Sequence, residues 1–120
     1  MQYIEAALTT DASGDASVTV QVNPGNNFIR KIEYVKTDYA DTVDISIVDA
    51  TGTVLLGLTN QTVSGEWCPT QPTHSTTGVA RLYAAGGLSV AELIPVVGSL
   101  AVTVDEGGNA KTGVIRIWVA

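Results

Sequence analysis

The sequence predicts an all-β protein, a single-domain antiparallel β-sandwich or jelly-roll-like fold of about eight strands. Apolar and polar residues alternate with a period of two in several segments. Turn-forming residues separate these segments at short intervals, and no segment has the capped, helix-period pattern of an amphipathic helix. A chain of 120 residues is long enough for one such domain with its own hydrophobic core.

Strict alternation defines the clearest strand candidates. In residues 17–22 it places Val18, Val20 and Val22 on one face. The same alternation, typical of antiparallel strands with one face in the core, recurs in residues 42–49, 99–105 and 113–119. The remaining strand candidates are residues 3–8, 28–36, 53–58 and 92–96.

Short turns connect most of these strands. They combine Gly, Asn, Asp and Pro and fall at residues 13–15, 23–26, 50–52 and 106–109. Residues 68–88 are different, because they form one long loop that contains Pro69 and Pro72. A loop of this length in a compact domain is usually functional or disordered. Within it, residues 79–84 fit either a short strand or a helical turn.

The protein is acidic, with six basic and twelve acidic residues and a formal net charge of −6. This charge would repel a phosphate backbone. The one basic cluster, Arg30, Lys31 and Lys36, is divided between the two faces of an extended strand. We therefore expect no nucleic-acid partner. Charged residues make up 15% of the chain, below the roughly 25% of an average soluble domain, which suggests that an assembly covers part of the surface.

The sequence predicts neither a membrane partner nor a secretion signal. The longest apolar run, residues 93–97, is short and contains Pro95. The first five residues lack the charged and apolar regions of a signal peptide. The single cysteine, Cys68, cannot form an internal disulfide, which fits a reducing compartment.

The chain does not predict an enzyme, and we expect no cofactor. His74 is the only histidine, which excludes a site built on paired histidines. Cys68 and His74 are the one conceivable pair of nucleophile and base, but no catalytic signature surrounds them. Because Cys68 follows Trp67, we interpret it as a buried thiol that packs like a small hydrophobic residue.

Three acidic residues, Asp38, Asp41 and Asp44, are the only candidates for a cation site. Carboxylates bind hard cations such as calcium. Their spacing is not that of an EF-hand loop, and Asp is common in turns because it hydrogen-bonds to nearby backbone. We predict no metal site and leave open whether a cation binds near these three residues.

Three aromatic residues are candidate contact residues. Trp67 and Tyr83 flank the long loop, where they would suit stacking on a sugar. Trp67 at a strand end and Trp118 in the last strand fit better at the edge of the core or at a subunit interface, where aromatic residues commonly anchor contacts. We favour the interface interpretation and keep glycan binding as the alternative.

The order of features along the chain resembles that of a known protein family. The matching features are residues 11–15, 29–35, 42–47 and 53–60, Trp67 with Pro69, His74, and residues 94–96 and 98–102. They cover the chain from about residue 11 to its end. This order is similar to that of small all-β proteins of tailed bacteriophages, which are encoded among the head genes and regarded as virion structural proteins.

The resemblance implies a capsid decoration or cement protein that is not an enzyme. Such proteins commonly have β-sandwich or jelly-roll-like folds, often form trimers, and bind the outer face of the mature head. The implied partners are the major capsid protein and further copies of the chain, with a trimer favoured. The implied location is the virion surface, after assembly in the host cytoplasm. The alternative is a receptor- or glycan-binding module on a phage vertex or tail fibre.

Two segments are the expected interfaces. Residues 1–10 would form an N-terminal strand or arm beside a sandwich domain of residues 11–120, with Tyr3, Ile4 and Leu8 adding a strand to a neighbour's sheet edge. The long loop, which carries Trp67, His74 and Tyr83 in or beside it, is the second. Packing within the same molecule is an equal alternative for both segments.

Overall fold

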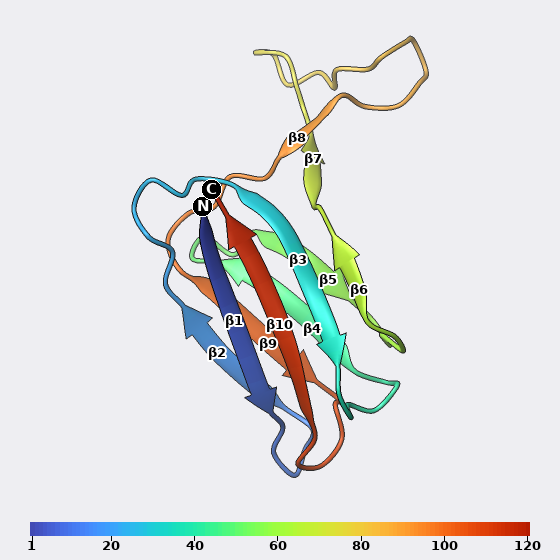
Figure 1. Ribbon diagram of the computed structural model, residues 1–120. Helices are drawn as coiled ribbons and strands as arrows, with labels where there is room; N and C mark the ends of the chain where they lie inside the picture. The colour runs from blue at the N-terminus through green and yellow to red at the C-terminus, as the bar shows by residue number, and fades with distance from the viewer.

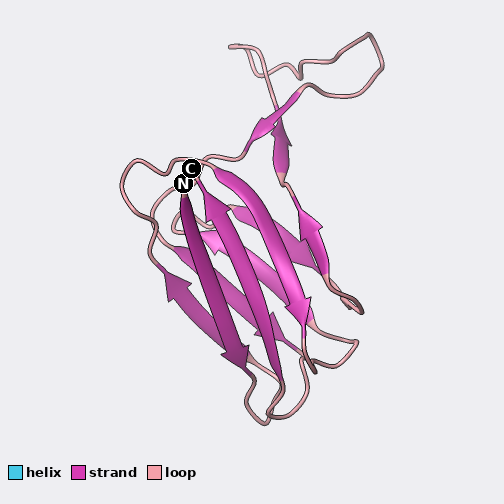
Figure 2. Ribbon diagram, in the orientation of Figure 1, coloured by secondary structure: helices cyan, strands magenta, loops and turns pink.

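The computed structural model describes all 120 residues, and its regular elements are all strands (Figure 1, Figure 2). In chain order they are β1 (Gln2–Thr9), β2 (Ala16–Val20), β3 (Ile29–Lys36), β4 (Asp44–Asp49), β5 (Val54–Leu58), β6 (Gly65–Trp67), β7 (Thr70–Pro72), β8 (Ala91–Leu93), β9 (Leu100–Asp105) and β10 (Thr112–Val119).

Eight of these strands form two four-stranded sheets that pack against each other (Figure 1). One sheet has the order β1-β10-β3-β6 and the other the order β2-β9-β4-β5, and every pairing is antiparallel. β7 and β8 form a separate two-stranded sheet that projects from one end of the sandwich. The prediction of an all-β antiparallel sandwich in a single domain is confirmed.

The core lies between the sheets because alternation places one face of each long strand there. Ile4, Ile117 and Ile32 lie opposite one another across β1, β10 and β3, and Ile47 faces Val102 across β4 and β9. All five belong to one buried cluster. Burial stabilises such a cluster by about 25 cal/mol per Å² of apolar surface. The core therefore fixes the sandwich and leaves its edges, ends and outer faces for contacts.

All eight predicted segments contain strands, but the long loop is predicted incorrectly. β7 lies inside the segment 68–88 and pairs with β8. Residues 79–84 form neither a strand nor a helical turn, and only isolated bridges occur there. β6 and β7 are three residues each, which is too short to show periodicity. Pairing with distant residues stabilises them, so their own sequence does not reveal them.

β3 contains an irregularity that simple alternation does not predict. Trp118 of β10 lies opposite Lys31, but the next residue, Val119, lies opposite Ile29, so Arg30 is an extra residue in β3. Ile29 and Ile32 are both buried although they are three positions apart, an odd spacing that would place them on opposite faces of a regular strand. A β-bulge shifts the side-chain alternation by one residue in this way. The bulge lets both isoleucines reach the core and leaves Arg30 exposed.

The N-terminal segment is a full strand of the sandwich. β1 pairs with β10 along its whole length, from Gln2 opposite Val119 to Thr9 opposite Thr112. Its core-facing residues include Ile4, which is buried, and Leu8, which packs against the core cluster. Of the two alternatives for residues 1–10, the structure therefore has packing within the same molecule, and β1 has a neighbour on one side only.

Two buried tyrosines stack inside the core near the end of β3. The rings of Tyr34 and Tyr39 are nearly parallel, with centroids 6.2 Å apart. The Tyr39 hydroxyl donates to the Leu8 carbonyl oxygen at 2.6 Å, whereas the buried Tyr34 hydroxyl has no hydrogen-bond partner. Gly113 of β10 lies against the Tyr39 ring, where a β-carbon would lie 2.3 Å from ring atom Cε2. Glycine is therefore required at position 113 by lack of space.

Candidate functional site

The most prominent surface feature is the projection, which we define as residues 70–93, comprising β7, β8 and the chain between them (Figure 1). Beyond the strands, the chain makes two successive small turns. The Ser75 N–H donates to the Val79 carbonyl, and the Tyr83 N–H donates to the Leu88 carbonyl. At the base of these turns, the Arg81 N–H donates to the Thr73 carbonyl, the Thr73 N–H donates to the Val90 carbonyl, and the Val90 N–H donates to the Arg81 carbonyl. These bonds connect the turns to the residue that precedes β8. The backbone of the projection is hydrogen-bonded, but the projection contributes no residue to the sandwich core.

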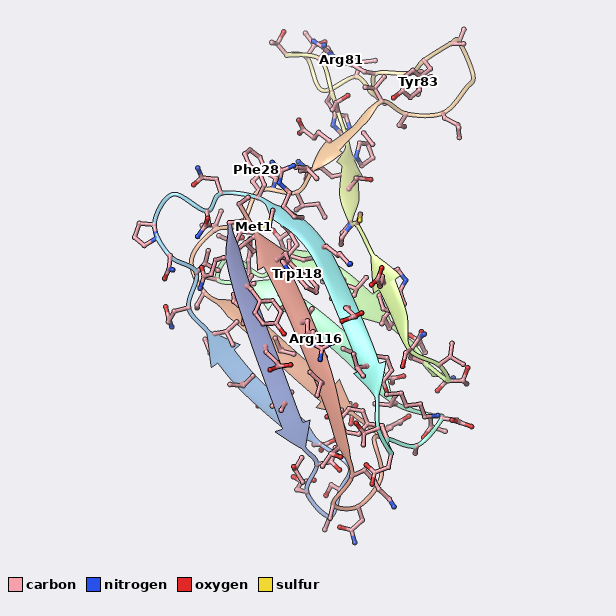
Figure 3. The ribbon with its side chains drawn as sticks, in the orientation of Figure 1. Met1, Phe28, Arg81, Tyr83, Arg116 and Trp118 are labelled. Carbon is pink, nitrogen blue, oxygen red and sulfur yellow. The ribbon has the colours of Figure 1, made fainter.

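Large apolar side chains are exposed on the projection. Tyr83 is 75% exposed and Leu88 is 82% exposed, and Val79 and Leu82 are also exposed. Figure 3 shows Tyr83 and Arg81 far from the sandwich. Soluble monomers rarely expose contiguous apolar patches, and those that occur often mark interaction sites. The projection therefore has the side chains of a contact surface.

The projection also differs from the rest of the chain in charge. Between Glu66 and Glu92 the sequence contains no Asp or Glu, and Arg81 is the only Lys or Arg. All twelve acidic residues thus lie outside this stretch. Low charge reduces the cost of removing a surface from water, so the projection is easier to bury against a partner than the rest of the surface.

The structure places the predicted loop residues in two environments. His74 and Tyr83 are exposed on the projection, whereas Trp67 lies on β6 and packs against the sandwich core. The structure therefore does not combine Trp67 and Tyr83 into one stacking platform. The buried thiol that we predicted at position 68 is wrong, because Cys68 is exposed where the chain leaves the sandwich. Trp67 takes the inward position, and its successor alternates outward.

The opposite end of the sandwich is strongly acidic. Three loops meet there: the Gly107 N–H donates to Gly14, the Ala40 N–H donates to Gly107, and the Thr10 N–H donates to Lys111. We call this the acidic end, because it gathers seven of the twelve acidic residues, Asp11, Asp15, Asp38, Asp41, Asp44, Asp105 and Glu106, against the two basic residues Lys36 and Lys111. The molecule thus has one acidic end and, at the other, a projection with exposed apolar side chains and only two charged residues, Arg81 and Glu92.

The three aspartates considered for a cation have separate partners. Asp38 accepts hydrogen bonds from the Thr112 N–H and hydroxyl, Asp41 pairs with Lys36, and Asp44 accepts from the Asn60 N–H. The bond from the Thr112 N–H lowers the pKa of Asp38. No group of three or more possible metal ligands occurs in the structure.

Asp15 and Asp105 repel each other at the acidic end. Their carboxyl groups are close enough to share a hydrogen bond, which needs a proton, and this contact raises the pKa of Asp15 above its usual value. A carboxyl whose pKa is raised by folding binds more protons in the folded state than in the unfolded state. Stability therefore falls as the pH rises through the range above about 4.

We expect Asp15→Asn to be more stable than the wild type at pH 7, with the advantage disappearing at pH 3. The amide keeps a donor for Asp105 and removes the repulsion. Thermal unfolding at both pH values measures the effect. Glu92→Gln is the control for charge alone, because Glu92 accepts from Gln71 and lies outside the acidic end. Equal gains in both variants would contradict the local repulsion.

The outer face of the β1-β10-β3-β6 sheet carries a second group of predicted residues. Tyr3 and Trp118 lie opposite each other on β1 and β10, with ring centroids 5.2 Å apart. The Lys31 ammonium lies 4.9 Å from the centroid of the Trp118 ring. This cation–π contact covers part of the indole. The structure thus brings Tyr3 and Trp118 together on one face, and Trp118 is half-covered by its own chain.

An ionic row runs beside these aromatic rings. Arg116 of β10 donates to Glu5 of β1 at 3.1 Å and to Glu33 of β3 at 2.8 Å, and it is visible on the sheet in Figure 3. The hydrogen bond from Arg116 lowers the pKa of Glu33. Bonds to Glu33 and Glu5 raise the pKa of Arg116. The charges in the middle of this face are therefore largely neutralised by each other.

Comparisons with protein-family models and with curated proteins find no match for this chain. No helical segment capable of spanning a bilayer occurs in the structure. The candidate function consequently rests on the surfaces described above. Val79, Leu82 and Leu88, which are exposed on the projection, were not among the predicted contact residues. The sequence feature that could have identified them is that they are large apolar residues in a stretch that has no carboxylate.

Proposed function

We propose that the chain is a structural protein of a bacteriophage virion that binds the outer surface of the capsid and stabilises it. The observation that carries the proposal is the projection, with exposed apolar side chains and Glu92 of β8 as its single carboxylate, at the end of the sandwich opposite the acidic end. The bacteriophage assignment itself rests on the resemblance in the order of sequence features.

The polarity of the molecule supports one orientation on the capsid. The projection would lie against the major capsid protein, where its apolar side chains lose contact with water. The acidic end would face the solvent, where like charges keep free copies soluble and separate from nucleic acid. A rigid sandwich between the two ends suits a clamp, because the core strands open only with the cost of global unfolding.

Capsid binding tests the proposal through the two most exposed side chains of the projection. We expect the double variant Tyr83→Ser and Leu88→Ser to bind more than about tenfold more weakly, because truncating hot-spot side chains near the centre of an interface costs about 2 kcal/mol or more. The measurement is co-sedimentation with heads of the encoding phage, prepared without this protein.

The matched control is the double variant Val54→Ser and Val63→Ser, which changes two exposed apolar residues outside the projection. It should bind like the wild type and fold equally well. The proposal would be overturned if only the control variant lost binding to the heads, or if the wild-type protein itself did not bind them. Quantitative mass spectrometry of purified virions gives a second test, because a lattice-bound cement protein should approach one copy per capsid subunit.

Recognition of a host receptor or glycan remains the second candidate, and the exposed ring of Tyr83 is the observation that favours it. Aromatic rings of this kind stack on sugars. If the chain has this function, we expect only a few copies per virion. Tyr83→Ser should then lose binding to cell-surface glycans without any change in head stability. A glycan array with no signal above background would remove it.

A further inference from the structure

We infer that two copies of this chain pair through β1, around a twofold axis, to form one continuous eight-stranded sheet. The inference concerns the edge of the sandwich and is independent of the capsid proposal. The four edge strands of the two sheets differ in length. β1 has eight residues, β2 and β5 have five each, and β6 has three.

β1 lacks the features that protect sheet edges. It contains no proline, no lysine and no register shift, whereas the pairing of β5 with β4 is irregular. Edge strands present unpaired N–H and C=O groups that form a template for another strand, and natural proteins usually block long ones. The Gln2 side chain bonds to Gln21 and Asn23 and covers only the first residue of the edge.

Hydrogen-bond alternation shows which residues of β1 face outward. The Thr10 N–H donates to Lys111 at the end of β10. In an antiparallel strand, successive residues direct their N–H and C=O groups to opposite sides. The even-numbered residues of β1 therefore bond to β10, and Tyr3, Glu5 and Ala7 direct their backbone groups to the free edge.

The strand is complementary to itself in one register. In this register, the numbers of two facing residues, one from each copy, add up to 12. Ile4 then lies opposite Leu8, and Ala6 lies opposite Ala6, on the core side. On the outer face, Glu5 lies opposite Ala7, so no like charges meet. A shift of two residues, to a sum of 10, would place the two Glu5 side chains opposite each other, which is unfavourable. This self-complementarity selects a second copy of the chain as the occupant of the edge.

Pairing would also cover apolar side chains that the single molecule leaves half-exposed. Leu8 of β1 and Val18 and Val20 of β2 pack against the core but are only partly buried. β1 and β2 lie along the same side of the sandwich (Figure 1). A second copy at this side would extend the core across the interface. The trimer implied by the sequence resemblance does not result from this pairing, since a twofold contact closes as a dimer.

Opposite charges at position 7 test the pairing and its register. Analytical ultracentrifugation of the free protein should give a dimer. Ala7→Glu would face Glu5 of the second copy and should weaken the dimer by roughly tenfold, whereas Ala7→Lys should strengthen it to a similar degree, because the contact occurs twice per dimer. Both side chains would be exposed in the monomer, so folding should not differ.

A disulfide at the symmetry axis tests the same register independently. In a Cys68→Ser background, Ala6→Cys should form a cross-linked dimer on mild oxidation, because the two thiols lie opposite each other. Ala7→Cys, which lies opposite position 5, should cross-link poorly. A monomer at about 100 µM, a trimer insensitive to position 7, or equal affinities for Ala7→Glu and Ala7→Lys would overturn the inference. Capsid binding affects none of these measurements.

Discussion

Gly113→Ala is expected to lower the free energy of unfolding by about 3 kcal/mol, at the upper end of the usual cost of overpacking a core. The new β-carbon would lie 2.3 Å from Cε2 of Tyr39. The Tyr39 ring cannot retreat freely, because it is buried and its hydroxyl is held by the Leu8 carbonyl at 2.6 Å. Either the ring moves and its hydrogen bond to Leu8 breaks, or β10 shifts away from the Tyr39 ring.

Gly57→Ala is the matched control. Gly57 also lies within a strand, β5, but a β-carbon there would meet only Cγ1 of Val54, at an ordinary 3.7 Å. The control should remain within about 0.5 kcal/mol of the wild type, as exposed substitutions usually do. Urea unfolding of both variants measures the difference. If both variants behaved alike, the close packing of Tyr39 against β10 would be refuted.

Tyr34→Phe and Tyr39→Phe are expected to change stability in opposite directions. Tyr34→Phe removes a buried hydroxyl that has no partner, and such a group costs about 1–3 kcal/mol, so the variant should be more stable by an amount in that range. Tyr39→Phe removes the bond to Leu8 and should cost about 1 kcal/mol. Because the two rings stack on each other, they share the same surroundings.

Both tyrosines make stability depend on pH, because burial also raises the pKa of Tyr34. Burial raises the pKa of Tyr39 to about 12 from the ordinary value of 10.0. The unfolded state therefore loses this proton first, and stability falls as the pH rises above about 10. Tyr39→Phe should lose less stability than the wild type between pH 9 and pH 11. Destabilisation by Tyr34→Phe would show that the hydroxyl of Tyr34 has a partner.

The surfaces of this molecule divide into three parts with different chemistry. The projection is apolar and nearly uncharged, the acidic end repels anions, and the free edge of β1 presents backbone groups. The projection suits a partner protein of a different kind, and the free edge of β1 suits a second copy of this chain. A dimer paired at β1 would keep both projections free, because the projection arises from the opposite side, after β6 (Figure 1). The two contacts are therefore compatible.

The strand positions and their buried faces were predictable from the sequence. Alternation is a local property, so the inward positions of β9 and β10, such as Val102 and Ile117, follow from the order of residues alone. The bulge at Arg30 was not predictable, because it depends on how β3 pairs with β10. The exposure of Cys68 was missed for a related reason. The chain leaves the sandwich there, and only the pairing of β7 with β8 determines its direction.

The sequence by itself determined an acidic, all-β chain, the faces of its long strands, and a weakly charged segment between Glu66 and Glu92. The tertiary structure decided that this segment projects, that the aspartates of three loops gather at one end, and that β1 keeps a free edge. The physical reason is that composition and alternation are properties of neighbouring residues. Projections, charged ends and free edges depend on which distant strands pair, and many pairings satisfy the same alternation.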